Sequence, residues 1–574
     1  MSVNEIYSRF KSLYKYTLFK LILFTTFLTI YLIIDQVYLG VPYYDVFVYL
    51  NNGLIYAGIP VGNISVIYLP PLMPFLASLL FRLGYMSVHT LFILDGIIFI
   101  LGVVGLYLLF RLRFTEIQST MGCLIFLSFP LIYSWAVSGG IDVPGIALSI
   151  WVIYFLVMGV KKNSNYLYLV FPMFIAALLV RYTDLILIFP ILLYLLINNN
   201  DNIFGNFKKV GAGFLASLLL IIPFLLYFYM KLGNLSALTN LLTSSIFGSG
   251  SAANDLAYNP DRLYYLSHIL NYISVGPILG GYGQLLNPST GFPSILSYIT
   301  IAVLIIGLSL YLYQILLKGK MDGVYHSNRK YTYYCLVMLI LLLPVGVYTF
   351  FMASFIVTEF IILFAIFFGY ELLKDIKYEY LDIDFLILSW FAAFFIFHSV
   401  LLLKVDRYFI TMIPALTYFI ILAFSVIIEK YKYNFKHIKL RSWGLYFIIG
   451  LIFISSSIAV HTGHSFIHGS GYTIQGTCNW IEKYDPNYRN EIIYSDYDPA
   501  YTWGLKKEVI IGVPRLYVST LAFSYYLTSN NADYYIDSFS EPKLNIPGYH
   551  IIKNISTTSV YQRNSLVVNS TNNV

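Results

Sequence analysis

The sequence predicts a polytopic α-helical membrane protein with a small α/β domain at its C-terminal end. Of the 574 residues, 59% are hydrophobic and 11% are charged, whereas about a quarter of the residues of an ordinary globular domain are charged. Apolar runs of about 20 residues, long enough to cross a bilayer, recur between residues 18 and 461. The segment that follows, 462–574, is polar and contains short strand-like runs.

We predict thirteen membrane spans from these apolar runs. The first run exceeds the core of a signal peptide and lacks a small-residue cleavage site, so we expect it to be retained in the protein. The predicted spans are 18–40, 88–110, 119–138, 143–160, 165–180, 184–198, 210–230, 294–317, 332–352, 356–373, 384–403, 408–429 and 444–461.

Basic residues give the orientation of these spans. With the N-terminus in the cytoplasm, every cluster of Lys and Arg between spans falls on the cytoplasmic side, as the positive-inside rule requires. The odd number of spans then places the C-terminal domain outside the cytoplasm, and we expect the plasma membrane as its location. The net charge of +7 therefore reflects orientation rather than binding to nucleic acid. The clusters are Arg9/Lys11/Lys15, Arg111/Arg113, Lys161/Lys162, Lys208/Lys209, Lys318/Lys320/Arg329/Lys330, Lys374/Lys377 and residues 430–441.

The first outer loop, 41–87, contains two short segments that we expect to lie on the membrane surface. In 45–57, apolar residues recur at helical spacing. The second segment, 72–85, is apolar but shorter than the roughly 17 residues that a crossing needs. If it crossed, Arg111 and Arg113 would lie outside the cell, against the positive-inside rule. We therefore divide the chain into a membrane module, 1–461, and an outer domain, 462–574.

Strand-like and helix-like runs alternate in the outer domain, which is typical of a small α/β fold. Asp496 and Asp498 have the spacing of a metal-binding acid pair, but Pro499 and a helical segment follow them, which favours a turn or a helix cap. The three cysteines are scattered and predict neither disulfides nor a metal site. The expected strands are 491–495, 509–513, 534–536, 549–553 and 559–563, and the expected helices are 478–483 and 516–527.

Two acids lie in adjacent outer loops and are candidates for chemistry. Asp45 follows Tyr44 at the start of the first surface segment, and Asp142 lies two residues before Pro144 in the next outer turn. Each can be a helix cap whose carboxylate accepts hydrogen bonds from first-turn amides. Because both are predicted on the same side of the membrane, the pair can also act as general base and substrate clamp. The residues alone leave both roles open.

Three cations on the outer face run against the positive-inside rule. Arg181 ends a span there, and Lys404 and Arg407 flank Asp406. Lys404 can bind the C-terminal carbonyls of a helix. Arg407 has no such role, because it would start the next helix at the positive end of its dipole, so an anionic partner such as a lipid phosphate would explain it. Glu359 opens another span, and ionisable groups at that depth are usually functional.

These features resemble the GT-C glycosyltransferases, with the protein O-mannosyltransferases and aminoarabinose transferases as the nearest types. The resemblance rests on an Asp in the first outer loop, two juxtamembrane helices with the run Tyr68-Leu69-Pro70-Pro71-Leu72, an Asp after the third span and the pattern Asp-Arg-Tyr-Phe-x-x-x-x-Pro at 406–414. Enzymes of that family often have a charged residue directly before the Pro motif, where this chain has Tyr68-Leu69. The chain also lacks the Trp-Trp-Asp-Tyr-Gly sequence of oligosaccharyltransferase catalytic subunits, which disfavours transfer of a whole oligosaccharide to Asn.

The resemblance implies an inverting transfer of a sugar from a polyprenyl (dolichyl) phosphate donor to an acceptor hydroxyl on the extracytoplasmic face. In that family the first-loop Asp is the catalytic base, which implies this role for Asp45, and the acid after the third span corresponds to Asp142. The acceptor can be protein, glycan or lipid. We expect no cofactor or metal, because the chain has no phosphate-binding glycine loop, nucleotide fingerprint or nucleophile elbow. The residues expected to contact the donor are Arg181, Lys404, Arg407, Tyr68 and Glu359.

Two other classes remain open from the sequence. A transporter or flippase of a lipid-linked or anionic substrate would also be polytopic, but it would show repeated halves and broken helices near the midplane. A membrane scaffold would account for the outer domain but not for the cations on the outer face.

Overall fold

The structure is a computed structural model of the chain. It describes residues 16–41, 43–59, 61, 66–198, 207–236, 238–240, 258–276, 283–321, 329–376, 378–431, 442–463, 470–540 and 542–564. The basic N-terminal cluster Arg9/Lys11/Lys15 lies outside these residues.

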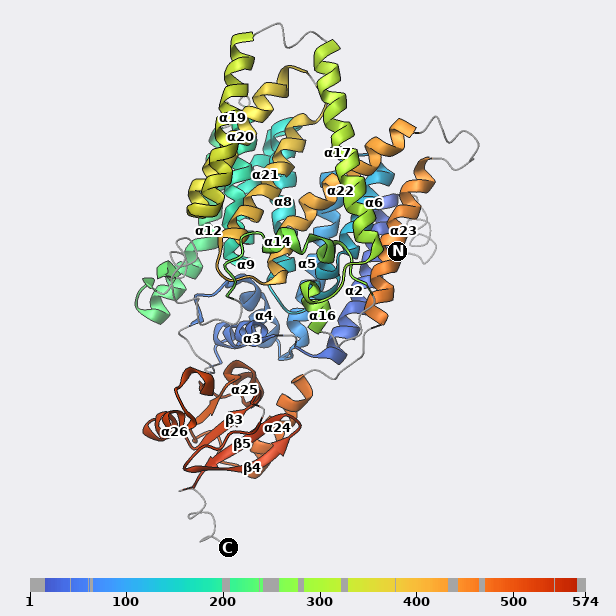
Figure 1. The fold of residues 1–574 in the computed structure, drawn as a ribbon. Helices are drawn as coiled ribbons and strands as arrows, with labels where there is room; N and C mark the ends of the chain where they lie inside the picture. Colours follow the sequence, from blue (N-terminus) through green and yellow to red (C-terminus); the bar gives the residue numbers. More distant parts are fainter. Residues whose placement is uncertain are drawn as a thin grey trace, which may run out of the picture.

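Long helices form one bundle, and a small sheet domain sits at one end of it (Figure 1). Within the described residues, ten helices are long and apolar enough to cross a membrane. They are α2 (Thr17–Leu39), α5 (His89–Phe110), α8 (Asp142–Lys161), α12 (Phe207–Leu232), α17 (Ile295–Met321), α19 (Arg329–Met352), α20 (Phe355–Leu373), α21 (Leu381–Val400), α22 (Ile413–Tyr431) with the 3-10 helix η7 (Asp406–Met412) before it, and α23 (Ser442–Thr462).

The other three predicted spans are broken or short. The run 119–138 divides into α6 (Glu116–Ser128) and α7 (Pro130–Trp135), because Pro130 cannot donate the hydrogen bond that would continue the helix. The remaining two are α9 (Leu167–Val180) and α10 (Ile188–Ile197), preceded by the 3-10 helices η2 (Ser164–Tyr166) and η3 (Tyr182–Leu187). At 1.5 Å per residue, α9 and α10 alone are shorter than the roughly 30 Å hydrocarbon core. The polytopic fold class is confirmed, but the count of thirteen spans is not.

The two expected surface helices are present as α3 (Tyr44–Ala57) and α4 (Leu72–Arg82). They pack against each other at the end of the bundle that faces the sheet domain (Figure 1). α4 has 11 residues, too few to cross a bilayer. Three further short helices, α14 (Tyr264–Ser267), α15 (Ile269–Ile273) and α16 (Gly283–Leu286), lie at the same end of the bundle.

The C-terminal part contains a five-stranded sheet in the order β2-β1-β3-β5-β4. The strand β1 is parallel to β2 and β3, and β5 is antiparallel to β3 and β4. This confirms the predicted α/β character, and each predicted strand overlaps an observed one. The elements are α24 (Ser470–Tyr484), β1 (Ile493–Ser495), α25 (Asp498–Leu505), β2 (Ile510–Ile511), the 3-10 helix η8 (Pro514–Leu516), α26 (Thr520–Ser529), β3 (Tyr534–Asp537), β4 (Tyr549–Ile555) and β5 (Thr558–Arg563).

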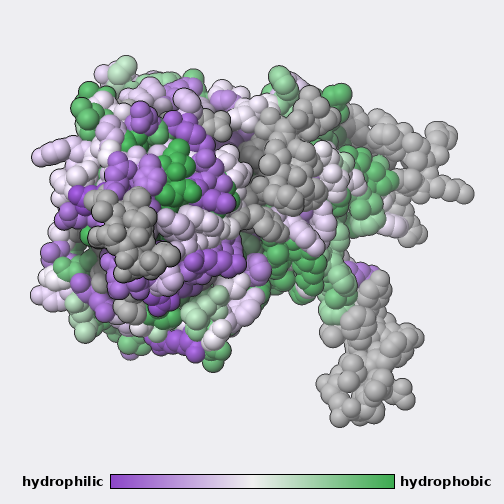
Figure 2. All heavy atoms as spheres, turned by 90° about the horizontal axis from the view of Figure 1, so that it is seen from below, coloured by the Kyte–Doolittle hydropathy of each residue, from purple (hydrophilic) through white to green (hydrophobic). Residues whose placement is uncertain are grey.

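The sheet domain shares a hydrophobic core with α3 and α4. The ring of Tyr497 packs edge-on against Phe47, with centroids 5.8 Å apart, and Trp503 packs on Phe81 at 5.7 Å. Seen from the sheet-domain end, the surface is largely hydrophilic, and hydrophobic side chains gather on the helices behind it (Figure 2). The domain therefore has a water-facing surface but is anchored to the two short helices by apolar contacts. The predicted boundary between 461 and 462 stays a prediction.

Several of the predicted cytoplasmic clusters meet at the opposite end of the bundle. Lys161 binds Asp382 at 2.7 Å, and Arg113 binds Asp384 at 3.2 Å. Both cations also lie over the ring of Tyr380. Helix α8 runs from Asp142 to Lys161, so this basic end lies about 28 Å from Asp142 at 1.5 Å per residue. The clusters thus share one end of the molecule, while the orientation of that end in a membrane stays a prediction.

We predict that Asp384→Ala destabilises the protein. Asp384 is buried and accepts hydrogen bonds from Arg113, Tyr311 and Tyr418, so its loss leaves a buried guanidinium without its counter-ion, at a cost of about 3–5 kcal/mol. Thermal unfolding in detergent should show a clear drop in melting temperature. Lys374→Gln is the control, because its pair with Glu371 lies within one helical turn and Lys374 is 39% exposed. Equal melting temperatures for the two variants would contradict the prediction.

Membrane orientation can be tested with introduced cysteines, because Cys123, Cys335 and Cys478 are all buried. We expect a membrane-impermeant maleimide to label Ser87→Cys in intact cells, since Ser87 lies in the predicted outer loop. Lys162→Cys lies at the basic end and should react only after permeabilisation. Labelling of position 162 and not of position 87 in intact cells would mean that the orientation is reversed or that 72–85 crosses the membrane. Labelling of both positions would mean that the number of crossings between 87 and 162 is even rather than odd.

Candidate functional site

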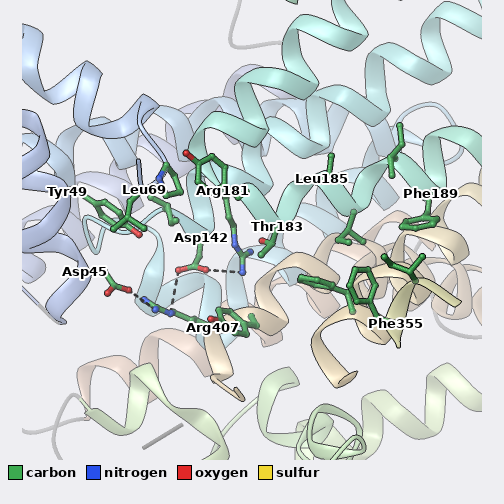
Figure 3. A pocket seen from close by; sticks show the side chains of 18 residues that line it. Asp45, Tyr49, Leu69, Asp142, Arg181, Thr183, Leu185, Phe189, Phe355 and Arg407 are labelled. Atoms are coloured by element: carbon green, nitrogen blue, oxygen red, sulfur yellow. Dashed lines mark hydrogen bonds and ion pairs between the residues drawn. The ribbon is translucent and has the colours of Figure 1, made fainter. Parts of the chain in front are cut away.

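A cavity of about 470 Å³ opens near the end of the bundle that faces the sheet domain. One end is lined by charged side chains, and the other by apolar ones from η3, α10 and α20 (Figure 3). The cavity can therefore hold a ligand with an ionic group joined to a hydrocarbon part. The charged end consists of Asp45, Asp142, Arg181 and Arg407, and the apolar end includes Leu185, Ile188, Phe189, Phe355, Ile356 and Phe397.

Asp45 lies in the first turn of α3, but it is not the helix cap. The N-cap residue is Tyr43, and no side chain caps this helix. The Asp45 carboxylate instead accepts a hydrogen bond from Arg407 at 2.8 Å and keeps 39% of its side chain exposed. It is thus positioned by a cation and is still open to a second partner.

Asp142 is placed by the turn before α8. Gly139 has φ +82°, and a Cβ atom there would also strike Val46, so only glycine fits. The buried Asp95 accepts a hydrogen bond from the Gly139 amide at 2.7 Å. Helix α8 then begins at Asp142 itself, with Pro144 in its first turn as the sequence indicated. Gly145 leaves room for Arg181. A Cβ atom added at position 145 would lie only 3.0 Å from the Cβ atom of Arg181.

The four charged groups form one network. Arg181 lies 3.1 Å from Asp142, and Arg407 Nε lies 3.9 Å from the second oxygen of Asp142. The side chains of Asp142 and Arg181 are 4% and 3% exposed, respectively. Charges buried this deeply must be paired, because an isolated one costs several kcal/mol to desolvate. Asp142 therefore holds both guanidinium groups in place.

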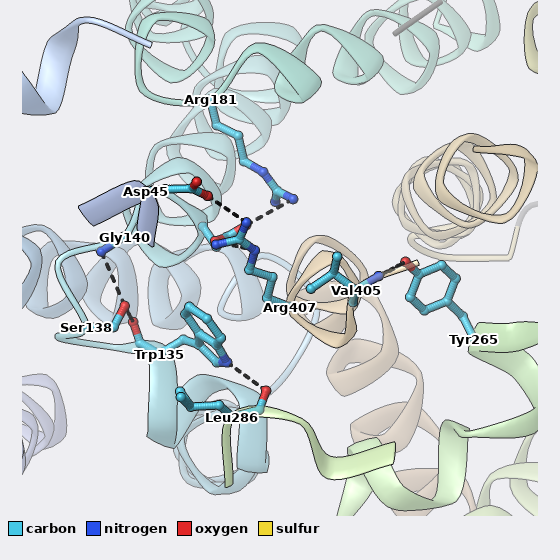
Figure 4. Close-up of polar contacts among 10 residues, drawn as sticks. Asp45, Trp135, Ser138, Gly140, Arg181, Tyr265, Leu286, Val405 and Arg407 are labelled. Carbon is cyan, nitrogen blue, oxygen red and sulfur yellow. Dashed lines mark hydrogen bonds and ion pairs between the residues drawn. The ribbon is translucent and has the colours of Figure 1, made fainter. Parts of the chain in front are cut away.

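Aromatic rings support the Arg407 guanidinium. It lies 4.5 Å from the ring centroid of Tyr43 and 5.5 Å from that of Trp135. Trp135 is fixed in turn by a hydrogen bond from its indole nitrogen to the carbonyl oxygen of Leu286 at 3.1 Å (Figure 4). These cation–π contacts orient the planar group toward Asp45 and the cavity.

Three expected contact residues do not line the cavity. Lys404 donates to the carbonyls of His398, Ser399 and Leu401 at the C-terminal end of α21. This is the contact with helix C-terminal carbonyls that the sequence offered as its alternative role. Glu359 is buried within α20, one turn after Phe355. Tyr68 contributes its backbone carbonyl, which accepts a hydrogen bond from the cavity residue Tyr182 at 2.5 Å.

Sequence analysis missed several residues of the site. Tyr49 lines the charged end, one helical turn after Asp45. Burial, followed by the nearby Asp45, raises the pKa of Tyr49 well above its usual range, so the phenol stays a hydrogen-bond donor. The i, i+4 spacing between Asp45 and Tyr49, which places both on one helix face, is the sequence signal that could have identified Tyr49. Thr183 and Tyr408 also line the cavity, and no sequence pattern marked them.

Asp406 has a structural role next to the site. It accepts hydrogen bonds from Tyr264, from Tyr272 at 3.0 Å and from the Ser289 amide at 2.8 Å. It does not pair with the adjacent Arg407, which is thus free to reach Asp45 and Asp142.

Three buried guanidinium nitrogens at the site make no hydrogen bond within the described structure. They are Arg181 Nη1, Arg181 Nη2 and Arg407 Nε, of which the last two lie within ion-pair distance of Asp142. The second oxygen of Asp142 is in the same situation. Unsatisfied buried donors on two cations favour an anionic ligand with several acceptor oxygens. Among the residues that the structure describes, no three His, Cys, Asp or Glu side chains are grouped as a metal site would require.

Comparison with known proteins agrees with this geometry. Residues 69–227 match the family model for dolichyl-phosphate-mannose-protein mannosyltransferase. Two crystal structures of ArnT from Cupriavidus metallidurans resemble the chain, one in the apo state with a TM-score of 0.53 and one bound to undecaprenyl phosphate with a TM-score of 0.52. Each has 9% sequence identity and covers 94% of this chain and 97% of its own.

The chain has the GT-C fold. This confirms the resemblance to GT-C glycosyltransferases of the ArnT and protein mannosyltransferase type that the sequence indicated. The archaeal oligosaccharyltransferase AglB from Archaeoglobus fulgidus also matches, with 12% identity, a TM-score of 0.49 and coverage of 91% of this chain and 69% of its own. No curated protein sequence matches the chain.

Proposed function

We propose that the protein is a membrane glycosyltransferase that transfers a sugar from a polyprenyl (dolichyl) phosphate donor to an acceptor hydroxyl on the extracytoplasmic face, with inversion. Asp45 is the catalytic base, and Arg181 and Arg407 bind the donor phosphate. Asp142 orients the two arginines. The acceptor is a protein, glycan or lipid hydroxyl.

One observation carries the proposal, namely the two-part character of the cavity. A polyprenyl phosphate has one anionic group next to a long hydrocarbon chain, and the cavity places two arginines beside apolar side chains of η3, α10 and α20. Arg181 Nη1, which takes part in no ion pair among the described residues, can donate to a phosphate oxygen, and Arg407 Nε, which lies 3.9 Å from Asp142 without a hydrogen bond, can donate to another. The ArnT structure bound to undecaprenyl phosphate has a ligand of the same chemistry in the same fold.

The different exposure of the two acids supports the roles proposed for them. Asp142 is almost completely buried between two cations, so it cannot meet an acceptor. Asp45 lines the cavity, its side chain is 39% exposed, and only one of its oxygens, Oδ2, is bound by Arg407 in the ion pair at 2.8 Å. A general base must lie within hydrogen-bond reach of the proton that it removes. Asp45 therefore suits the base, and Asp142 suits the structural anchor.

The reaction then needs one base and no general acid. The acceptor oxygen attacks the anomeric carbon while its proton passes to Asp45. The bond from that carbon to the phosphate oxygen breaks, and both electrons leave with the phosphate, which Arg181 and Arg407 stabilise as the charge develops. Attack from the face opposite the leaving group inverts the anomeric centre.

Purified protein with a labelled polyprenyl phosphate sugar and a panel of acceptors tests the proposal. Label should move to an acceptor and free polyprenyl phosphate should appear. If the labelled lipid instead crosses the bilayer of proteoliposomes unchanged, the protein is a flippase, which is the alternative that the sequence left open.

We predict that Asp45→Asn abolishes sugar transfer while the protein stays folded and still binds the donor. An amide can accept the hydrogen bond from Arg407 but cannot take a proton. Turnover, donor binding and melting temperature are measured on the same sample. Asp375→Asn is the matched control, because it makes the same change on an exposed acid at the basic end. Near-normal turnover of the Asp45→Asn variant would limit Asp45 to a structural role.

We predict that Arg407→Gln weakens donor binding more than Lys404→Gln. Loss of a charge-assisted contact to phosphate costs about 1.5–3 kcal/mol, which raises the donor Kd roughly tenfold or more. Lys404 contacts backbone carbonyls and not the cavity, so its replacement should lower the melting temperature with little change in donor Kd. If Arg407→Gln lowers only the melting temperature, Arg407 is a structural ion-pair partner rather than a phosphate ligand.

A further inference from the structure

A hydrogen bond joins the sheet domain to the helix turn that carries Asp45. The hydroxyl of Tyr44 donates to Asp498 at 2.9 Å, across 454 positions of sequence. Tyr44 precedes Asp45 in α3, and Asp498 is the first residue of α25. The ring of Tyr44 also lies 5.8 Å from that of Tyr497. The neighbouring Asp496 accepts a hydrogen bond from the Ser538 amide at 2.9 Å.

The first turn of α3 depends on such external contacts. A helix begins with four amide groups that lack partners inside the helix, and a capping side chain usually fixes them. Tyr43, the N-cap residue of α3, makes no such bond. The side-chain contacts that hold this turn are Tyr44 to Asp498 and Asp45 to Arg407. The position of the Asp45 carboxylate is therefore set from both sides.

Tyr44 also separates two spaces. The site cavity lies on the side of Asp45. On the other side, Tyr44 lines a groove of about 1370 Å³ in the sheet domain, together with Asp496, Tyr497, Arg515 and Phe539. Successive residues in a helix point about 100° apart, so Tyr44 and Asp45 can face the groove and the cavity at the same time. The groove wall and the residue proposed as the base are thus adjacent positions of one helical turn.

We propose that Tyr44 and Asp498 are a positioning pair, through which the sheet domain fixes the first turn of α3 and aligns Asp45 with the donor. The inference rests on the proposed function. The pair acts through Asp45 and does not contact the reacting atoms. Its loss lowers kcat, because a displacement of the base by about 1 Å costs on the order of a hundredfold in rate, while donor binding by Arg181 and Arg407 is retained.

The test uses the full-length protein and three single variants. We expect Tyr44→Phe and Asp498→Ala, which remove the donor and the acceptor respectively, each to lower kcat by about ten- to a hundredfold, with donor Kd and melting temperature close to those of the wild type. The double variant should be no worse than either single one, because both changes remove the same interaction. Tyr534→Phe is the matched control, since it removes a Tyr–Asp hydrogen bond of similar length, 3.0 Å to Asp485, inside the sheet domain. It should leave kcat unchanged.

A second control separates positioning from docking. Asn51 donates to the carbonyl of Pro499 at 2.9 Å, and so joins the same two elements away from the first turn of α3. We expect Asn51→Ala to lower the melting temperature and to leave kcat close to that of the wild type. If Asn51→Ala lowers kcat as much as Tyr44→Phe does, or if Tyr44→Phe leaves kcat unchanged, the positioning role is refuted.

Hydrogen exchange gives a readout that does not need activity. Amides of residues 48–51, which donate to the carbonyls of the first turn of α3, should exchange faster in Tyr44→Phe than in the wild type, and in Tyr534→Phe they should not change. Unchanged exchange in Tyr44→Phe would overturn the inference even if the wild type transferred no sugar. An inactive wild type would refute the proposed function instead, so the two failures are distinguishable.

Discussion

The pairing of buried charges at one end of the helix bundle is the constraint on which the site depends. Arg181 and Arg407 are too deeply buried to remain without counter-ions, and Asp142 and Asp45 supply them. The four residues come from α3, α8, the start of η3 and η7, so the network fastens together elements that are up to 362 positions apart in the chain. Because the acids do not saturate the guanidinium groups, the same network leaves donors available to an anionic ligand.

The surrounding structure gives each charge a different environment. Asp142 lies under the turn that Gly139 and Asp95 fix, and is closed to solvent. Asp45 lies at the start of a helix that has no side-chain cap, and is open. Two identical functional groups thus acquire different environments, which in the proposed function suit one to anchor cations and the other to accept a proton. The apolar end of the cavity would, in the proposed function, contact the hydrocarbon part of the donor.

The sheet domain packs directly against the helices that carry part of the site. Its core is continuous with α3 and α4 through contacts such as Phe47 with Tyr497 and Phe81 with Trp503. The polar contacts Tyr44 to Asp498 and Asn51 to Pro499 lie along the same interface. Apolar contacts stabilise the packing of the two parts against each other, while the hydrogen bonds fix their relative position. The helix that carries Asp45 therefore belongs to both parts.

Composition and apolar run length determined the membrane class, the two short surface helices and the α/β character of the C-terminal part, because these depend on local hydrophobicity and period. The run 119–138 was predicted as one span because its apolar length is sufficient for a crossing, but Pro130 divides it into two helices. Charge placement singled out Asp45, Asp142, Arg181 and Arg407, and the sequence offered a helix-end role to Lys404 but not to Arg407, while both stayed candidates for the donor phosphate. Only the tertiary structure decided that Lys404 binds carbonyls of α21 while Arg407 reaches Asp45, because side-chain partners hundreds of positions apart are set by packing and leave no local signal.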